Sequence, residues 1–348
     1  MASLKPLQAL LGMGSMADFQ QNKKLVLDYY AELDAASPND LAATIEAYAG
    51  KNYFWRGLHP FNEISDPQEV AERFWKPFRK AFTSIQRRPD VFMAGNNVIE
   101  DVGGTWVCCM GHMLGLFDED WLGIPSTGKM AFLRFVEFHK IDSGIIEQTA
   151  LFFDIPSVMR QAGVNPFPAE TGAWFLTPGP KTHDGLLYDE QDPDETGKTM
   201  DLIHRMIDDL TSSGMESPKN ELAATWHQDM IWFGPTGIGA AYTIPRYQEQ
   251  HQGPFRSGLD EIVFNGHKCR FSEGNYGGFF GWPNLTMKPS GGFMGFPATA
   301  GTADMRVVDI YRRDGDFLAE NWIFIDLLYF YYQQGVDILA RMKSICRT

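Results

Sequence analysis

Cysteine is scarce in this sequence and is not arranged to bind metal. The 348 residues contain four cysteines, of which Cys108 and Cys109 are adjacent while Cys269 and Cys346 stand apart. None of them has the spacing of metal ligands, and four scattered thiols do not indicate a disulfide framework. The sequence therefore predicts reduced thiols, no bound metal and a cytoplasmic protein.

Long hydrophobic runs and clusters of positive charge are also missing. No run approaches the roughly 20 apolar residues that span a bilayer, and the apolar patch from Leu7 to Leu11 is too short and too weakly charged for a signal peptide. The net charge is −14, without a Lys/Arg cluster to offset it. We therefore expect neither nucleic acid nor a membrane as a partner, because both would work against this field.

What the sequence does contain is an internal repeat. Asp154 stands nine residues before Gly163, and Asp326 stands nine residues before Gly335, at an offset of 172. Other segments return in the same order: NDLAAT (39–44) as NELAAT (220–225), KPF (76–78) as GPF (253–255), GHMLGLF (111–117) as GNYGGFF (274–280), and GIPSTG (123–128) as GFPATA (295–300). A period of this length indicates two copies of one domain, and the chain length agrees.

Each half has helix signals first and strand signals afterwards. In the first half Ser37-Pro38 and Asp66-Pro67 combine a cap residue with an early proline, and strand-like alternation begins at Val91. In the second half Ser217-Pro218 repeats a helix start, and a last helix is expected over 326–342. The order predicts an α+β fold in which three helices cover one face of a mostly antiparallel, curved sheet.

The expected domains span residues 18–165 and 198–343. Residues 166–197 between them are rich in proline and acidic residues, so we expect a linker without regular secondary structure.

The last strand carries the first candidate site. Strand-like runs over 305–312 and 317–325 flank an Asp-Gly hairpin turn. Side chains alternate along a strand, so Glu320, Trp322 and Asp326 share one face. Two carboxylates and an indole among apolar residues suggest a site, although a satisfied buried polar pair is an equally open interpretation.

The motifs together resemble a known family. WKPF and HQGPF, the GHxxGxF and GNYxGxF strands, the FPAT turn and the closing E-N-W-x-x-x-D-x-x-x-x-x-x-Q-x-G are similar to those of SnoaL-like polyketide cyclases, in the nuclear-transport-factor-two-like superfamily. The resemblance covers both halves. It implies tandem cone-shaped curved sheets, each wrapped by three helices around a pocket, and catalysis without a metal or organic cofactor.

The resemblance also implies roles for particular residues. Family cyclases use a pocket Asp at the end of the last strand as acid/base, and the matching positions are Asp326 and Asp154. An intramolecular aldol closure needs a proton removed from an activated methylene and one delivered to the new alkoxide. A carboxylate with a raised pKa in an apolar pocket can do both. Glu320 would tune the pKa of Asp326 or bind a hydroxyl.

Substrate contacts follow from the same comparison of the halves. Trp322 and Trp282 would stack on a planar substrate, and Asn275, aligned with His112, would hydrogen-bond a carbonyl. Tyr276 and His251 complete the expected contacts of the second half: Asn275, Tyr276, Trp282, Trp322 and His251.

The halves are not equal, and we expect the second to be active. The first half has Gln148 and Ala150 where the second has Glu320 and Trp322. It would be a degenerate copy that packs against the second as an intramolecular pseudo-dimer, as two chains do in family dimers, and a further homodimer stays open. His112 and Asp154 are the candidates for a second site.

Plainer interpretations exist for each residue. Asp326 and Asp154 are also good helix caps, and His112 is also a typical core histidine. His227, Asp229 and His251 lack the spacing of a metal site. The glycines of GNYGGFFGW indicate a bent strand rather than a phosphate loop.

Three functions remain open from the sequence. The first is a cofactor-free cyclase, isomerase or lyase that uses a pocket Asp on a carbonyl-containing small molecule. The second is an inert module that binds a small hydrophobic ligand. The third is an interaction platform whose pockets are filled by its own aromatic side chains.

Overall fold

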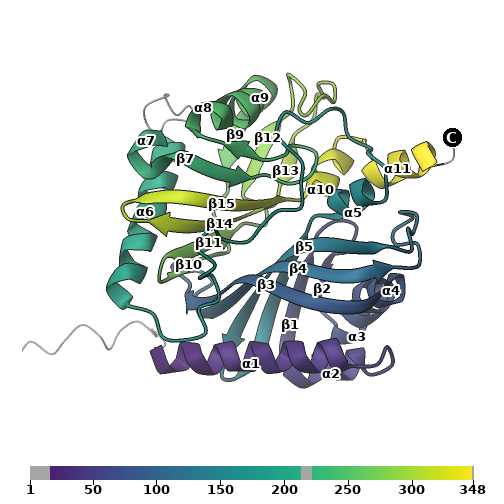
Figure 1. Cartoon of the computed structure of the whole chain (residues 1–348), viewed down its shortest axis with the longest axis vertical. Helices are drawn as coiled ribbons and strands as arrows, with labels where there is room; N and C mark the ends of the chain where they lie inside the picture. Colours follow the sequence, from purple (N-terminus) through teal and green to yellow (C-terminus); the bar gives the residue numbers. More distant parts are fainter. Residues whose placement is uncertain (1–15, 213–221, 347–348) are drawn as a thin grey trace, which may run out of the picture.

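The computed structural model describes residues 16–212 and 222–346, and it forms two sheet bodies with helices (Figure 1). The first half contains α1 (Met16–Ala35), α2 (Leu41–Tyr48), β1 (Ala49–Gly57), β2 (Asn62–Ile64), α3 (Pro67–Val70), the π-helical turn η2 (Ala71–Trp75), α4 (Lys76–Ala81), β3 (Phe82–Asn96), β4 (Thr105–Phe117), β5 (Met130–Asp142), β6 (Ile145–Phe153) and α5 (Ile155–Gln161).

The second half follows with the same order of elements. It contains α6 (Pro193–Ser212), α7 (Leu222–Thr225), β7 (Trp226–Phe233), β8 (Ala241–Tyr242), α8 (Ile244–Tyr247), the π-helical turn η3 (Gln248–Gln252), α9 (Gly253–Gly258), β9 (Asp260–Phe264), β10 (Cys269–Glu273), β11 (Tyr276–Phe280), β12 (Leu285–Lys288), β13 (Ala303–Met305), β14 (Val307–Asp314), β15 (Phe317–Ile325), α10 (Leu327–Tyr332) and α11 (Ile338–Cys346).

The strand order repeats as well. The first sheet runs β2-β1-β6-β5-β4-β3 and the second runs β10-β11-β14-β15-β7-β8, which is the same succession read from the other edge. In both sheets, the first strand of the half pairs parallel to the last six-stranded-sheet strand of that half: β1 with β6, and β7 with β15. The other neighbouring strands are antiparallel. Helices and mixed sheets in this arrangement confirm the predicted α+β class.

The long strands of the first sheet are interrupted in the second. β3, β4 and β5 are continuous over 13 to 15 residues. In the second half β9, β12 and β13 separate from β10, β11 and β14 and form a small sheet of their own, in the order β13-β12-β9. Pro283, between β11 and β12, has no N–H to offer a ladder, which is one reason for the break.

Helix ends follow the local chemistry, with one correction. The Asp66 side chain accepts from the Gln68 backbone N–H and Pro67 opens α3, as predicted. The last helix was expected to be continuous over 326–342, and this was wrong. α10 and α11 are separate because Gly335 takes a φ of 81° and the Val336 N–H turns back to the Tyr331 carbonyl, which ends α10 in a left-handed cap.

Two further expectations concern segments between the halves. α6 begins at Pro193, inside the segment expected to be linker. The preceding residues run as irregular chain along β3, with hydrogen bonds from Phe92 N–H to Gly185 O and from Leu187 N–H to Phe92 O. The helix start predicted at Ser217-Pro218 lies outside the described residues, and within the described ranges no helix is long and apolar enough to cross a membrane.

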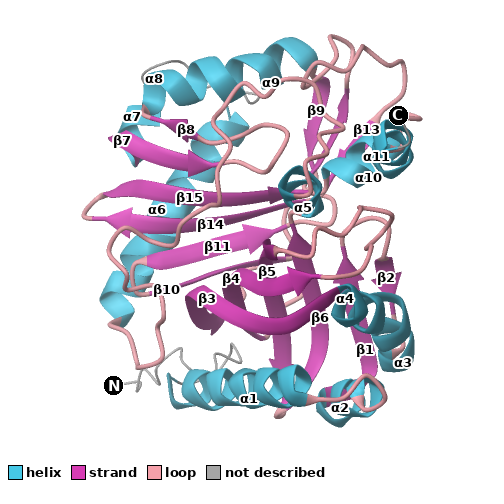
Figure 2. Ribbon diagram, turned by 45° about the vertical axis from the view of Figure 1, so that its right-hand side comes forward, coloured by secondary structure: helices cyan, strands magenta, loops and turns pink. Residues whose placement is uncertain are grey.

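The two six-stranded sheets pack face to face. Figure 2 shows them stacked, with α1 and α2 beyond the first sheet and α8 and α9 beyond the second. Their facing side chains form one buried cluster, in which the ring of Phe280 lies 5.6 Å from Trp106, 5.1 Å from Phe138 and 5.9 Å from Phe152. The opposite face of each sheet packs against helices, and the buried side chains there belong to a second cluster.

We expect truncation of this central ring to destabilise the whole chain. Phe280 is fully buried, so Phe280→Ala should lower the free energy of unfolding by about 3–5 kcal/mol through lost burial and the cavity left behind. Urea unfolding measures it. Met130→Ala, at a side chain that is 62% exposed, is the control and should change stability little. Equal effects of the two would contradict a shared core.

Candidate functional site

The face that carries Glu320, Trp322 and Asp326 contacts the first half and the segment between the halves. Trp322 lies between the two sheets, stacked on Phe233 with 5.5 Å between ring centroids, and its Nε1–H donates to the Pro178 carbonyl at 2.9 Å. Stacking of Trp322 on a substrate stays a prediction, and in the structure its indole is buried between the sheets. The strand alternation was right, but this face meets the other half.

Glu320 is likewise held by protein groups. Its carboxylate pairs with the Arg312 guanidinium and accepts from the Lys181 backbone N–H at 3.2 Å. The residue is 3% exposed. This is the satisfied buried pair that the sequence left open.

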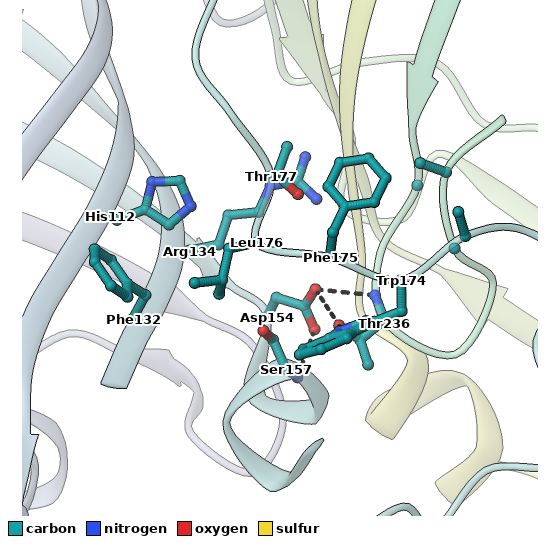
Figure 3. A pocket seen from close by; sticks show the side chains of 14 residues that line it. His112, Phe132, Arg134, Asp154, Ser157, Trp174, Phe175, Leu176, Thr177 and Thr236 are labelled. Carbon is teal, nitrogen blue, oxygen red and sulfur yellow. Dashed lines mark hydrogen bonds between the residues drawn. The ribbon is translucent and has the colours of Figure 1, made fainter. Parts of the chain in front are cut away.

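Asp154 and Asp326 occupy equivalent places at the seam between the halves. Asp154 caps α5 by accepting from Ser157 N–H at 3.1 Å, and its other oxygen accepts from the Thr236 N–H and hydroxyl at 2.9 and 3.0 Å (Figure 3). Asp326 caps α10 through Tyr329 N–H at 3.1 Å and accepts from His59 N–H at 3.0 Å. Each carboxylate thus joins its own helix to a loop of the other half.

The charge of Asp326 is also balanced within the protein. Burial raises its pKa, while Arg306 at 3.3 Å and the backbone N–H groups of His59 and Tyr329 oppose the rise. The helix-cap interpretation describes both aspartates, and a catalytic role for either stays a prediction. The space next to Asp154 and His112 is about 10 Å³, room for about one water molecule.

Most of the other predicted contact residues are bound to protein groups, and one of them lines a cavity. Asn275 accepts from Arg313 at 2.7 Å, the Tyr276 hydroxyl donates to Asp184 at 2.5 Å, and Trp282 donates to Glu63 at 2.8 Å. His112 lies 3.2 Å from Asp90. Of the nine predicted site residues, only His251 lines the cavity described next.

The cavity lies in the second half, between the helix-facing side of its sheet and the helices α6, α8 and α9. Its volume is about 170 Å³, comparable to a cavity that holds a benzene ring. Most of its lining is apolar, from Met206, Ile207 and Leu210 of α6 to Ile323 and Ile325 of β15. Apolar enclosure with a few polar groups is typical of a small-molecule site.

Asp309 is the carboxylate of this cavity. It is 7% exposed, and its Oδ1 accepts from the Asn321 side chain at 3.0 Å. The Tyr311 side chain also hydrogen-bonds to it. Burial raises the pKa of Asp309 to about 7, and the hydrogen bonds from Asn321 and Tyr311 limit the rise. A carboxyl group that titrates near neutral pH is suited to proton transfer in both directions.

Two histidines line the same cavity. His251, in η3, stacks on Trp232 with 4.0 Å between centroids, and His267 stacks on Phe279 at 3.9 Å. Burial lowers the pKa of each to about 3, so both imidazoles are neutral at physiological pH. Among the described residues, no group of three His, Cys, Asp or Glu side chains is placed to hold a metal ion.

The equivalent space in the first half is filled by protein. At the offset of 172, Glu137 takes the place of Asp309, and the Arg87 guanidinium lies 3.5 Å from it and over the Tyr30 ring at 3.9 Å. Burial raises the pKa of Glu137, but His139 and Arg87 bring it below its usual value. At the offset of 177 that aligns KPF with GPF, Phe74 replaces His251.

The internal repeat also contains a sequence signal for Asp309. FVEFHK (135–140) and VVDIYR (307–312) stand at the same offset of 172 as the two capping aspartates. Asp309, Tyr311 and Asn321 lie on the opposite strand face from Trp322, where an acidic side chain alternates with apolar ones. That alternation could have selected them.

Comparisons with known proteins come from structure. No family model matches the sequence, and no curated protein matches it. A proposed SnoaL-like polyketide cyclase from Jannaschia sp. is 18% identical with a TM-score of 0.33, over 42% of this chain and 95% of that one. AclR, a proposed hydroxylase from Streptomyces galilaeus, is 17% identical with a TM-score of 0.34, over 48% and 88%.

A third structure gives a similar result. An NTF2-like protein from Burkholderia xenovorans is 13% identical with a TM-score of 0.33, over 40% of this chain and 97% of that one. These likenesses are in line with the sequence resemblance to SnoaL-like cyclases. They carry no argument about a reaction, and the fold class stands on strand order and pairing.

The raised pKa of Asp309 makes stability depend on pH. With a folded pKa of about 7 and an unfolded pKa of about 3.9, the folded state keeps a proton that the unfolded state has lost, so stability falls as pH rises from about 4 to 7. Asp309→Asn removes this pH-dependent loss of stability. Relative to wild type, the variant should gain up to about 4 kcal/mol between pH 4 and pH 8.

Urea unfolding of both proteins at pH 4 and pH 8 measures this difference. Asp229→Asn, at a side chain that is 68% exposed, serves as the control for loss of one negative charge. A wild-type and Asp309→Asn pair with parallel pH dependence would show that folding does not raise the pKa of Asp309.

Proposed function

We propose that the second half is an acid/base enzyme of the cyclase, isomerase or lyase type, with Asp309 as the proton-transfer group. Its substrate would be a small molecule with a carbonyl group. The observation that carries this is the Asp309 carboxyl at the wall of an apolar cavity, hydrogen-bonded to Asn321 and Tyr311. This proposal replaces Asp326, Glu320 and Asp154 as the catalytic residues.

The chemistry follows from the surroundings of the carboxyl. Ionised Asp309 would remove a proton from carbon next to the carbonyl and return it elsewhere on the molecule, which covers isomerisation, aldol closure and elimination. Asn321 keeps one Asp309 oxygen oriented, and the hydroxyl of Tyr247, whose pKa is raised by burial, stays a neutral donor for a developing enolate oxygen. Proton transfer of this kind needs only these side chains.

A substitution pair separates Asp309 from the original candidate. Small hydroxy-carbonyl and polyketide-like compounds are screened by thermal shift, and each hit is followed by mass spectrometry with wild type, Asp309→Asn and Asp326→Asn. We expect wild type and folded Asp326→Asn to convert a hit, and Asp309→Asn to bind it with turnover lowered by about 10²–10⁴. Hits bound equally and left unchanged by all three would indicate a binding module instead.

The pH profile gives an independent test. Because the ionised form of Asp309 would act as the base, kcat/KM should rise with pH and reach half its plateau near pH 7, the pKa of this carboxyl. Steady-state rates from pH 5 to 9 measure it. A profile already flat from pH 5 would mean that a carboxylate with an ordinary pKa acts as the base, and Asp326→Asn would then be the variant to compare.

A further inference from the structure

The two histidines of the cavity stand on either side of Asp309. In the second sheet, β11, β14, β15 and β7 are consecutive neighbours. Phe279 of β11, under His267, is paired with Asp309 of β14, and Trp232 of β7, under His251, is paired with Asn321 of β15. Three strand spacings of about 4.8 Å separate β11 from β7. The imidazoles therefore flank the Asp309–Asn321 pair from opposite sides.

Both imidazoles lack a hydrogen-bond partner at one nitrogen. The Nδ1 atoms of His251 and His267 are buried, and within residues 16–212 and 222–346 neither has a donor or acceptor in reach. Buried polar atoms are normally paired, and an unpaired one is destabilising. Both rings line one cavity, beside a carboxyl that is already hydrogen-bonded to Asn321, and a ring turned so that a nitrogen faces the cavity would gain its partner from a bound molecule.

The rings are held in a way that suits this role. Each is stacked on an indole or phenyl ring at 4.0 Å or less, with 22° or 14° between the planes. A half-turn about the Cβ–Cγ bond keeps the stacking plane and exchanges Nδ1 with Cδ2, so each ring can present a nitrogen to the cavity. A neutral imidazole has one donor and one acceptor, which match a hydroxyl or a carbonyl oxygen.

We propose that His251 and His267 determine substrate specificity, and that the substrate is a planar compound of one or two rings with a hydroxyl or carbonyl oxygen at each end. The middle of such a molecule lies over Asp309 when its oxygens reach the two imidazoles. This inference rests on the proposed function for the reaction at that middle carbon, and the binding it requires is measured separately.

Three probes of one shape test the oxygen preference. Equilibrium dialysis measures the Kd of naphthalene, 2-naphthol and 2,6-dihydroxynaphthalene for the full chain. We expect affinity to rise by about 2- to 10-fold with each hydroxyl. His251→Phe introduces the residue type of the equivalent position in the first half, Phe74. It should abolish the gain in affinity from one of the two hydroxyls and leave the Kd of naphthalene within about 2-fold. His267→Phe should abolish the gain from the other hydroxyl.

Two further comparisons keep the test decisive. His251→Gln retains a donor and an acceptor and should restore part of the lost gain in affinity, which a packing role would not predict. Arg256 also lines the cavity, so 2-naphthoate is included as an anionic probe. Preference for 2-naphthoate unaffected by the histidine variants, or equal weakening of naphthalene and the diol, would overturn the inference.

The outcomes are separable from those for Asp309. Asp309→Asn should still bind the diol in preference to naphthalene, because its histidines are intact. If no compound is turned over but the histidine-dependent order of affinities holds, the acid/base proposal fails and the ligand class stands. If turnover depends on Asp309 but affinity does not respond to hydroxyls, the proposed ligand class fails and the acid/base proposal stands.

Discussion

Packing of the two sheets against each other is the constraint on which the rest of this structure depends. Side chains alternate along a strand, so a sheet has two faces to bury. Here one face of each sheet meets the other sheet around Phe280, and the opposite face meets the helices. The cavity of the second half lies on the helix side of its sheet, which is where β14 and β15 direct Asp309, Tyr311 and Asn321.

The repeat and the element order were readable from the sequence because they depend on local chemistry. Asp66-Pro67 opens a helix in any context that leaves its cap free, and the doubled motifs required one topology twice. From β15 alone the face that lines the cavity was not readable, because Trp322 on one side and Ile323 on the other are both buried apolar residues, and the acidic side chain that marks this face is on β14. Only the three-dimensional partner distinguishes them, and the family motif drew attention to the side that packs.

The two halves show how one fold closes or keeps a pocket. In the first, a guanidinium beside Glu137 and an aromatic ring at Phe74 occupy the space between sheet and helices. In the second, Asp309 has neutral neighbours, and burial alone then shifts its protonation toward neutral pH. The carboxyl is paired with arginine in the first half and hydrogen-bonded to the Asn321 amide in the second, although the strand order is the same.

The reciprocal aspartates carry a consequence for how the chain can be divided. Asp154 accepts a hydrogen bond from the Thr236 N–H of the second half, and Asp326 accepts one from the His59 N–H of the first. Either half expressed alone would expose the aromatic side chains that now face the other sheet. Its capping carboxylate would also lose the backbone N–H donor that the other half supplies. One half by itself is for this reason not a transferable module, and the pair is the smallest unit for protein engineering.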